Sequence, residues 1–551
     1  MYVTEVLSRS KDKTYRCVLL REAYREGGKV KNRTLANLSH CQPNEIAAIR
    51  LALQHKGELA VLGSLPEAVE IREGRSIGAV WTVYQVARQR GIERALGSER
   101  QGKVALWQVI GRVISQGSRL SAVRLAQTHA VCEILGLKGS FDENDLYENL
   151  AWLAEQRPEI EKKLFRARRR GKKPELFFYD VTSSYLEGKC NELADWGYNR
   201  DKKAGKKQIV IGLLCDEEGE PVSADVFKGN TLDFATLGAQ VKKVAQLFGC
   251  QRVTVVGDRG MIKSQQIAEL GREGFHYITA ITKAQIEALL KQEVLRLEGF
   301  GEEVVEVEHQ GVRYVLRRNE QRVQDMAYTR RSKQRWVEGK LEKKNTYLAQ
   351  HPRARVATAL QELQEHITRL HLSHWLQVES EGRRLHVKAD EAALAQESRL
   401  DGCYVLKSDL PKEAADPQTI HDRYKDLAEV ERVFRTCKTA HLEVRPVYVR
   451  TEQSTRGHVL VVMLAYLVVR QLRRAWAELD MTVEEGVAEL STLCSMKVEV
   501  KGQGSCHRLV SPRESSAQLL KAAEIRLPKV LPEQEARVVT RKKLPSRRLR
   551  P

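Results

Sequence analysis

Leu-Phe-Phe-Tyr-Asp at residues 176–180 and Arg-Val-Thr-Val-Val-Gly-Asp at residues 252–258 are the two stretches that decide the fold. Each is a short apolar run, which predicts a buried strand, and each ends in an aspartate, Asp180 or Asp258. A single aspartate at this position is more often a turn residue or a helix cap. Two of them predict carboxylates at the rim of an α/β sheet, where functional sites are usually built.

The chain between and beyond these aspartates has the pattern of a mixed sheet. Strands are expected at residues 208–215, 222–226 and 276–281, and a helix at residues 231–247. Three strands joined by short turns, followed by alternating helix and strand, predict an α/β sheet with helical cover.

A third carboxylate comes from a charged helix expected at residues 420–440. Tyr424, Glu431 and Lys438 are spaced by seven residues, close to two helical turns, so all three are expected on one face. That face offers a carboxylate for a metal site and two groups that can hold a DNA phosphate. The same spacing fits an ordinary surface helix with heptad-like periodicity equally well.

Three carboxylates brought together suit hard divalent cations, which prefer oxygen ligands. Two such cations about 3.5–4 Å apart can activate an attacking oxygen and stabilise a leaving one in phosphodiester cleavage. We therefore take Asp180, Asp258 and Glu431 as candidate catalytic and metal-binding residues. Mg²⁺ is the expected cofactor, with Mn²⁺ as the alternative.

Composition and charge agree with an enzyme that acts on nucleic acid. The 551 residues predict three or four domains, and 92 Lys and Arg against 72 Asp and Glu give a net charge of +20. Such an excess attracts polyanions, although a basic protein that binds no nucleic acid would share it. The longest apolar run, residues 459–469, is too short to span a membrane and predicts a buried helix.

The ten cysteines are scattered and form no Cys-x-x-Cys pair, so a zinc ribbon is not expected. The N-terminus lacks the apolar segment of a signal peptide. Free thiols in a reducing cytoplasm are the plain interpretation.

The helix at residues 420–440 resembles the Tyr-x2-Arg-x3-Glu-x6-Lys signature of insertion-sequence transposases in the insertion-sequence-four superfamily, which Tyr424, Glu431 and Lys438 match at the right spacing. Further blocks similar to segments of that family are residues 179–184, 229–233, 256–260 and 442–448 with His458. Each block is weak alone, but together they are specific. The resemblance covers roughly residues 90 to 475.

The resemblance implies an α/β fold with a ribonuclease-H-like catalytic core interrupted by a β-containing insertion, preceded by an N-terminal mixed or helical domain. The long gap between Asp258 and Glu431 leaves room for that insertion. The expected parts are an N-terminal DNA-binding or helical region at 1–165, the first part of the core at 166–290, the insertion at 291–414, the glutamate helix and the helix after it at 415–480, and a basic C-terminal region at 481–551.

Two local patterns refine the N-terminal part. The first sixty residues have the pattern of short strands with a turn at residues 25–29. Two helices flank Gly117-Ser118 within residues 104–135, and they fit either a DNA-reading helix-turn-helix or, more simply, a helical hairpin.

The resemblance implies a DDE transposase that cleaves transposon ends and joins them to target DNA by metal-dependent cut-and-paste chemistry. Its partners would be double-stranded terminal inverted repeats and target DNA, bound by a homodimer in the bacterial cytoplasm or nucleoid, with no membrane. Two alternatives share the core: a catalytically silent DNA-binding protein derived from a transposase, and a nuclease that never joins strands. The presence of all three carboxylates, Asp180, Asp258 and Glu431, argues against a protein that has lost its catalytic activity.

Tyr424 and Lys438 are expected to contact a DNA phosphate. Leu427 occupies the position of the signature arginine and cannot make that contact. The missing charge is expected from one of three neighbouring arginines, unless the contact is absent altogether. These are Arg423, Arg432 and Arg435.

Trp336 and Trp375 are the two tryptophans of the expected insertion. In the family that the chain resembles, an aromatic residue from this region can stack on a base displaced near the cleavage site. Either tryptophan fits that role, and a place in a hydrophobic core is the alternative for both.

Overall fold

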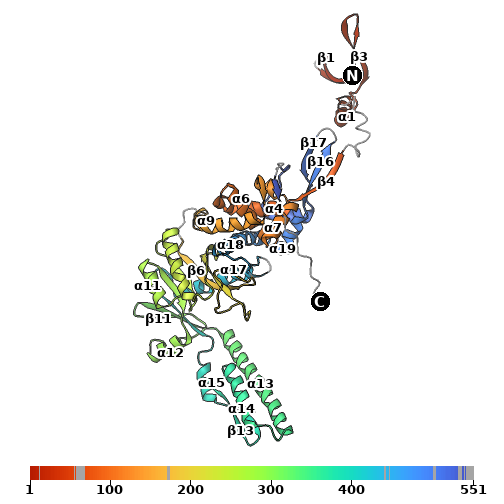
Figure 1. The fold of residues 1–551 in the computed structure, drawn as a ribbon. Helices are drawn as coiled ribbons and strands as arrows, with labels where there is room; N and C mark the ends of the chain where they lie inside the picture. Colours follow the sequence, from red (N-terminus) through yellow and green to blue (C-terminus); the bar gives the residue numbers. More distant parts are fainter. Residues whose placement is uncertain are drawn as a thin grey trace. The chain divides into compact units, whose positions relative to one another are not determined.

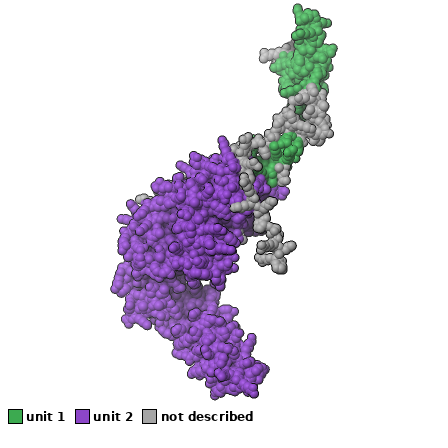
Figure 2. All heavy atoms as spheres, in the orientation of Figure 1, with its two compact units in different colours: residues 1–76, 493–512, 527–533 green, residues 77–492, 513–526, 534–551 purple. Residues whose placement is uncertain are grey.

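The chain forms two compact units in the computed structural model, coloured separately in Figure 2: residues 1–76, 493–512 and 527–533, and residues 77–492, 513–526 and 534–551. The structure describes residues 1–10, 13–54, 56, 69–169, 174–439, 442–445, 447–500, 504–531, 536–538 and 540. The basic end expected at residues 541–551 lies outside the described residues.

The first unit contains two small antiparallel sheets (Figure 1). One has the order β1-β2-β3, with β1 at Tyr2–Ser10, β2 at Lys13–Glu26 and β3 at Lys29–Asn37, and is followed by α1 at Pro43–Gln54. The other has the order β17-β16-β4, with β4 at Val69–Ser76, β16 at Cys494–Val500 and β17 at Gly504–Leu509. The N-terminal strands and the turn between β2 and β3 are as predicted, whereas α1 was not.

An eight-stranded mixed sheet is the centre of the second unit, with the order β11-β12-β15-β10-β9-β6-β7-β8. β9 pairs in parallel with β6 and β10, and every other neighbouring pair is antiparallel. The strands are β6 Leu176–Tyr185, β7 Gln208–Asp216, β8 Pro221–Phe227, β9 Thr254–Gly257, β10 His276–Ala280, β11 Val305–His309, β12 Val312–Arg318 and β15 Cys403–Ser408. The predicted mixed α/β sheet is confirmed.

Helices cover both faces of this sheet. α10 at Asp233–Lys242, extended by a π-helical turn to Leu247, and α11 at Ser264–Arg272 pack with Phe177, Tyr179 and Val181 of β6. α17 at Ala428–Lys438 also contacts β6, and α18 at Glu452–Ala475 contacts β8. Because successive side chains of a strand point to opposite faces, Asp180 faces away from Tyr179 and Val181.

α18 is the central helix of an all-helical layer. Its most apolar stretch is long enough to cross a membrane, but 83% of that stretch is buried inside the protein, as expected of a core helix. It contacts α4 Gly78–Gln89, α6 Arg100–Ile114, α9 Glu143–Arg169 and α19 Val483–Ser491 (Figure 1). These helices in turn contact α5 Ile92–Leu96, α7 Arg119–Thr128, α8 Val131–Leu135 and α20 Glu514–Ala522. The short strands β5 Gly139–Phe141 and β18 Ala536–Val538 pair in parallel.

The burial of α6 bears on the two interpretations of residues 104–135. From Val104 to Val113 every residue of α6 is buried, and α7 packs against α9 through an inner face that includes Val123. A helix pair that reads a DNA groove needs its second helix free for the bases. α7 leaves most of its side chains at least partly exposed and packs on α9 more than on α6, so the packing does not decide between the two interpretations.

The region expected as an insertion, residues 291–414, divides between two cores. β11, β12 and β15 belong to the main sheet and pack with α12 at Lys283–Lys291. The segment between β12 and β15 has its own hydrophobic core. It consists of α13 Glu320–Gln350, α14 Val356–Arg369, β13 Leu376–Glu381, β14 Arg384–Ala389 and α15 Glu391–Ser398.

Substitution of Gly457 by alanine tests the close packing of α18 on α9. A Cβ atom at this position would lie 2.0 Å from the backbone oxygen of Leu150, so Gly457→Ala must push the two helices apart. We expect a loss of about 1–3 kcal/mol in the free energy of unfolding, measured by urea denaturation. Gly339→Ala in α13 is the matched control, because nothing lies within 4 Å of its Cβ position and alanine favours a helix. Equal stability of the two variants would contradict this account.

Candidate active site

The parallel pairing of β6 with β9 sets Asp180 beside Asp258. Tyr179 pairs with Gly257, and each aspartate is the next residue along its strand direction. The prediction that the first strand ends at Asp180 is wrong, because β6 continues to Tyr185 along the ladder that it forms with β7. On the other side of β6, β9 ends at Gly257, so the sheet leaves an opening where the two carboxylates lie.

Glu431 lies in the first turn of α17. The single helix predicted at residues 420–440 is wrong, because α16 ends at Lys425 and α17 begins at Ala428. Across the break, the N–H of Leu427 donates to the oxygen of Tyr424 at 3.2 Å, and the N–H of Val430 donates to the oxygen of Leu427 at 3.1 Å. These bonds span three residues instead of four, so the backbone tightens there and Tyr424 belongs to a separate helix, α16 at Pro417–Lys425.

One cavity of about 380 Å³ collects the three predicted carboxylates. Its lining combines acidic, basic and apolar side chains from β6, the loop after it, the start of α10, the segment after β9, and α17. The lining residues are Asp180, Val181, Thr182, Arg200, Asp233, Asp258, Met261, Glu431, Phe434, Arg435 and Lys438.

The carboxylates of this cavity influence each other. The pKa of Asp180 is raised to about 7, mainly by burial and also by the negative charges of Asp258 and Glu431, while the N–H of Val181 and the charge of Arg200 act in the opposite direction. Asp258 accepts the N–H of Arg259 at 2.7 Å and the hydroxyl of Tyr424 at 3.5 Å. Burial, followed by the charge of Asp258, raises the pKa of the Tyr424 hydroxyl, which therefore stays protonated and can donate.

The donor set of the cavity fits a hard divalent cation. Within the described part of the chain, no three His, Cys, Asp or Glu side chains are close enough to form a complete metal cage. Mg²⁺ does not need one, because it keeps several waters and is usually held by one or two carboxylates together with substrate phosphates. Asp180, Asp258 and Glu431 supply only oxygen ligands, and a cation between them would offset the mutual repulsion that adds to the effect of burial on the Asp180 pKa.

Lys438 reaches the cavity but is already engaged by a carboxylate. Its ammonium donates to Asp201 Oδ1 at 2.9 Å, and Arg445 binds the same oxygen. Asp201 also accepts the N–H of Tyr185 at 3.2 Å, and its side chain is almost fully buried. Asp201 therefore fixes the last turn of α17 to the end of β6, a contact that the sequence pattern did not predict.

The three candidate arginines have different surroundings. Arg435 lies one turn after Glu431 and lines the cavity. Arg432 is exposed and pairs with Glu429, and Arg423 does not line the cavity. Leu427 is only 9% exposed, so an arginine there would have to bury its charge or disturb the helix break. Of the three arginines, Arg435 is the one that lines the cavity.

Arg200 and Asp233 are cavity residues that sequence reasoning did not assign. They form an ion pair at 2.5 Å, and the backbone N–H of Arg200 donates to Ser183 Oγ at 3.0 Å. Arg200 lies in the long connection between β6 and β7, which has no periodicity to guide a prediction. Asp233 is the first residue of α10 and the last residue of the block at 229–233, neither of which predicts a place in the cavity.

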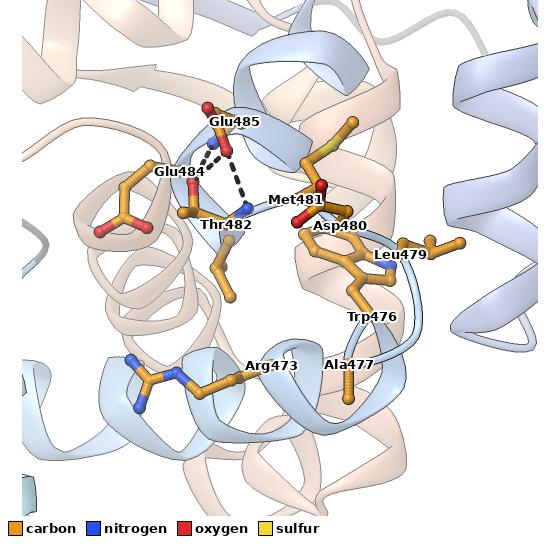
Figure 3. A pocket seen from close by; sticks show the side chains of 10 residues that line it. Arg473, Trp476, Ala477, Leu479, Asp480, Met481, Thr482, Glu484 and Glu485 are labelled. Atoms are coloured by element: carbon orange, nitrogen blue, oxygen red, sulfur yellow. Dashed lines mark hydrogen bonds between the residues drawn. The ribbon is translucent and has the colours of Figure 1, made fainter.

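A larger hollow of about 630 Å³ lies between the end of α18 and α19 (Figure 3). Its polar groups include Thr482 and Glu485, which bond each other in the capping box of α19, drawn as dashed lines in the figure. These groups are used to begin a helix, so the carboxylate cavity remains the candidate active site.

Asp201→Ala tests the attachment of α17. The substitution leaves Lys438 and Arg445 without their shared carboxylate in a largely buried place, and we expect a loss of about 3 kcal/mol in the free energy of unfolding. Glu187→Ala is the control, since its pair with Lys206 in the same connection is exposed and should contribute less than about 1 kcal/mol. Urea denaturation compares the two, and similar losses would refute the role given to Asp201.

Comparisons with known proteins give two family matches. Residues 171–468, more than half of the chain, match the family described as Transposase DDE domain, and residues 3–61 match the N-terminal domain of the IS1634 family transposase. No curated protein matches the chain. The grouping in the insertion-sequence-four superfamily remains a prediction.

Two solved structures are similar to parts of the chain. The cryo-EM structure of a piggyBac transposase synaptic complex with hairpin DNA shares 9% identity, covers 81% of this chain and 75% of its own, and has a TM-score of 0.34. The Mos1 transposase paired-end complex with the left transposon end shares 10% identity, covers 27% and 52%, and has a TM-score of 0.14. Both scores are too low to carry an argument about this chain.

Proposed function

Because this chain belongs to the family of transposases with a DDE domain and is therefore a DNA transposase, we propose that Asp180, Asp258 and Glu431 are its catalytic carboxylates. The observation that carries the proposal is the single cavity that all three line. The carboxylates come from three elements that are far apart in the sequence. Their meeting in one cavity is therefore not a consequence of closeness along the chain.

The family implies a divalent metal cation, and we propose Mg²⁺, with Mn²⁺ as the alternative. When bound, such cations activate the attacking oxygen and stabilise the leaving oxygen of a phosphodiester. The three carboxylates would hold them, and the hydroxyl of Tyr424 would orient Asp258. Arg435 and Lys438 bring positive charge to the same cavity, where a DNA phosphate must lie during cleavage.

We infer that the mixed sheet is a ribonuclease-H-like core and that residues 319–402, between β12 and β15, form its insertion. Support comes from the three antiparallel strands followed by two parallel ones, and from the separate hydrophobic core of the inserted segment. Of the five-part division at 1–165, 166–290, 291–414, 415–480 and 481–551, the insertion is thereby narrowed from 291–414 to 319–402, because β11, β12 and β15 belong to the main sheet. The other parts stay a proposal.

The DNA substrates that we propose are the terminal inverted repeats of a mobile element and a target duplex. Cut-and-paste joining needs both element ends held together, so we propose a homodimer on DNA. The cysteines at 17, 41, 190, 215, 250, 403 and 437 carry free thiols, which is the state expected in the cytoplasm that we propose as the location.

Asp180→Ala, Asp258→Ala and Glu431→Ala should each reduce cleavage at element ends by several orders of magnitude while leaving DNA binding intact, since each removes a metal ligand. The substrate is a duplex from the sequence flanking the gene, incubated with Mg²⁺ or Mn²⁺, and chelator should stop the reaction. A transposase forms products in which the cleaved end is joined to a second duplex, whereas a nuclease does not, so these products distinguish the two activities.

Glu429→Ala is the matched control for the carboxylates. Glu429 lies on the same helix as Glu431 but pairs with Arg432 and does not line the cavity, so this variant should cleave normally. Near wild-type cleavage by any of the three carboxylate variants would remove that residue from the proposed site.

Of the two tryptophans, we propose Trp336 as the one that stacks on a base, because its ring is partly exposed and that of Trp375 is buried. Trp375 is 2% exposed inside the core of the inserted segment, whereas Trp336 is 41% exposed on α13, with Lys340 over its ring. Trp336→Ala should therefore slow cleavage of fully paired ends, by an amount equivalent to about 1–3 kcal/mol, and affect ends with an unpaired terminal base less. Tyr328→Ala, an exposed aromatic on the same helix, is the control. Unchanged cleavage of paired ends by the Trp336 variant would contradict a stacking role for Trp336.

A further inference from the structure

The register of the N-terminal sheet sorts its side chains into two chemically different faces. Opposite residues of an antiparallel pair share a face, and successive residues alternate. Val18, Glu22 and Tyr24 of β2 therefore share the first face with Glu5 of β1 and Arg33 of β3. The second face carries, from β2, Leu19, Arg21, Ala23 and Arg25, and opposite them on β3 Asn37, Thr34, Asn32 and Val30.

The first face is covered or neutralised. Val18 is buried, and Arg50 of α1 donates to Glu5 at 3.0 Å, so α1 packs on this side. The glutamates of the face are all in ion pairs with basic side chains of the same face. The pairs are Arg16 with Glu5, Arg33 with Glu22, and Lys31 with Glu26.

The second face has positive charge without acidic partners. Among the side chains that the structure describes on this face there is no Asp or Glu, and Arg21 and Arg25 form no ion pair or side-chain hydrogen bond. Every residue of β3 is exposed, and Val30, opposite Arg25, is 63% exposed. Since β3 is exposed on both faces, the second face is distinguished by its unpaired positive charge, whereas Lys31 and Arg33 of the first face are in ion pairs.

We propose that this second face of the β2–β3 hairpin, defined by Arg21, Arg25, Asn32 and Thr34, binds double-stranded DNA. The inference rests on the proposed function, since it assigns a DNA-contacting surface to the same transposase. A two-stranded β-ribbon fits the major groove, which is about 12 Å wide. Arginine, asparagine and threonine are side chains that bind phosphates and base edges, and small Ala23 permits close approach.

The test measures binding of the full-length protein to two duplexes, one of mixed sequence and one from the sequence flanking the gene. Chelator is present throughout, so cleavage does not occur and the catalytic carboxylates do not contribute. Arg21→Ala/Arg25→Ala should weaken binding to the flanking duplex by at least about tenfold and lower the slope of log affinity against log salt by about two.

The matched control is Lys31→Ala/Arg33→Ala, which removes two positive charges from the opposite face of the same hairpin and should change affinity less than about threefold. Arg21→Lys/Arg25→Lys keeps the charge and should restore the salt slope, which separates lost contacts from a misfolded sheet. Equal losses in the two alanine variants would show a dependence on net charge alone and overturn the proposal.

Two other outcomes also overturn the assignment. One is unchanged DNA affinity in Arg21→Ala/Arg25→Ala. The other is a changed molecular mass in solution with unchanged DNA affinity, which would make the face an interface between copies of the chain. Cleavage by the carboxylate variants tests the catalytic site separately, so failure of one proposal is distinguishable from failure of the other.

Discussion

The parallel pairing of β6 with β9 is the contact on which the rest of the active site depends. It places Asp180 and Asp258 one residue beyond the paired positions Tyr179 and Gly257. β6 is long because β7 supports it to Tyr185, whereas β9 stops at Gly257. The unequal lengths of the two neighbouring strands make the opening into which a third carboxylate can reach.

Glu431 reaches that opening because α17 is held at both ends. At its start, buried Leu427 and the tightened turn after Tyr424 fix the direction in which the helix begins. At its end, Asp201 binds Lys438 and connects the helix to β6. The positive charge near the carboxylates is thus partly structural, because Asp201 binds Lys438 and Asp233 binds Arg200. Among the described residues that line the cavity, Arg435 is the basic side chain that forms no ion pair.

The strands of the main sheet were predictable because each buries an apolar run that the sequence shows directly. The break between α16 and α17 was not, because Tyr424, Glu431 and Lys438 keep a helical spacing straight through it. Trp336 and Trp375 were equivalent in sequence, and only packing against α13, α14 and β13 separates the buried one from the exposed one. The division of the charged side chains between the two faces of the N-terminal hairpin likewise depends on the register of strand pairing, which the sequence alone left open.

The sequence by itself determined the mixed α/β sheet, the three carboxylates and their likeness to DDE transposases, because apolar periodicity and motif spacing are local properties. Only the tertiary structure decided that the carboxylates share one cavity, that Asp201 holds Lys438, and that Leu427 is buried. Those facts depend on contacts between residues more than two hundred positions apart, as with Asp201 and Lys438. Such contacts follow from strand pairing and helix docking, which no local pattern encodes.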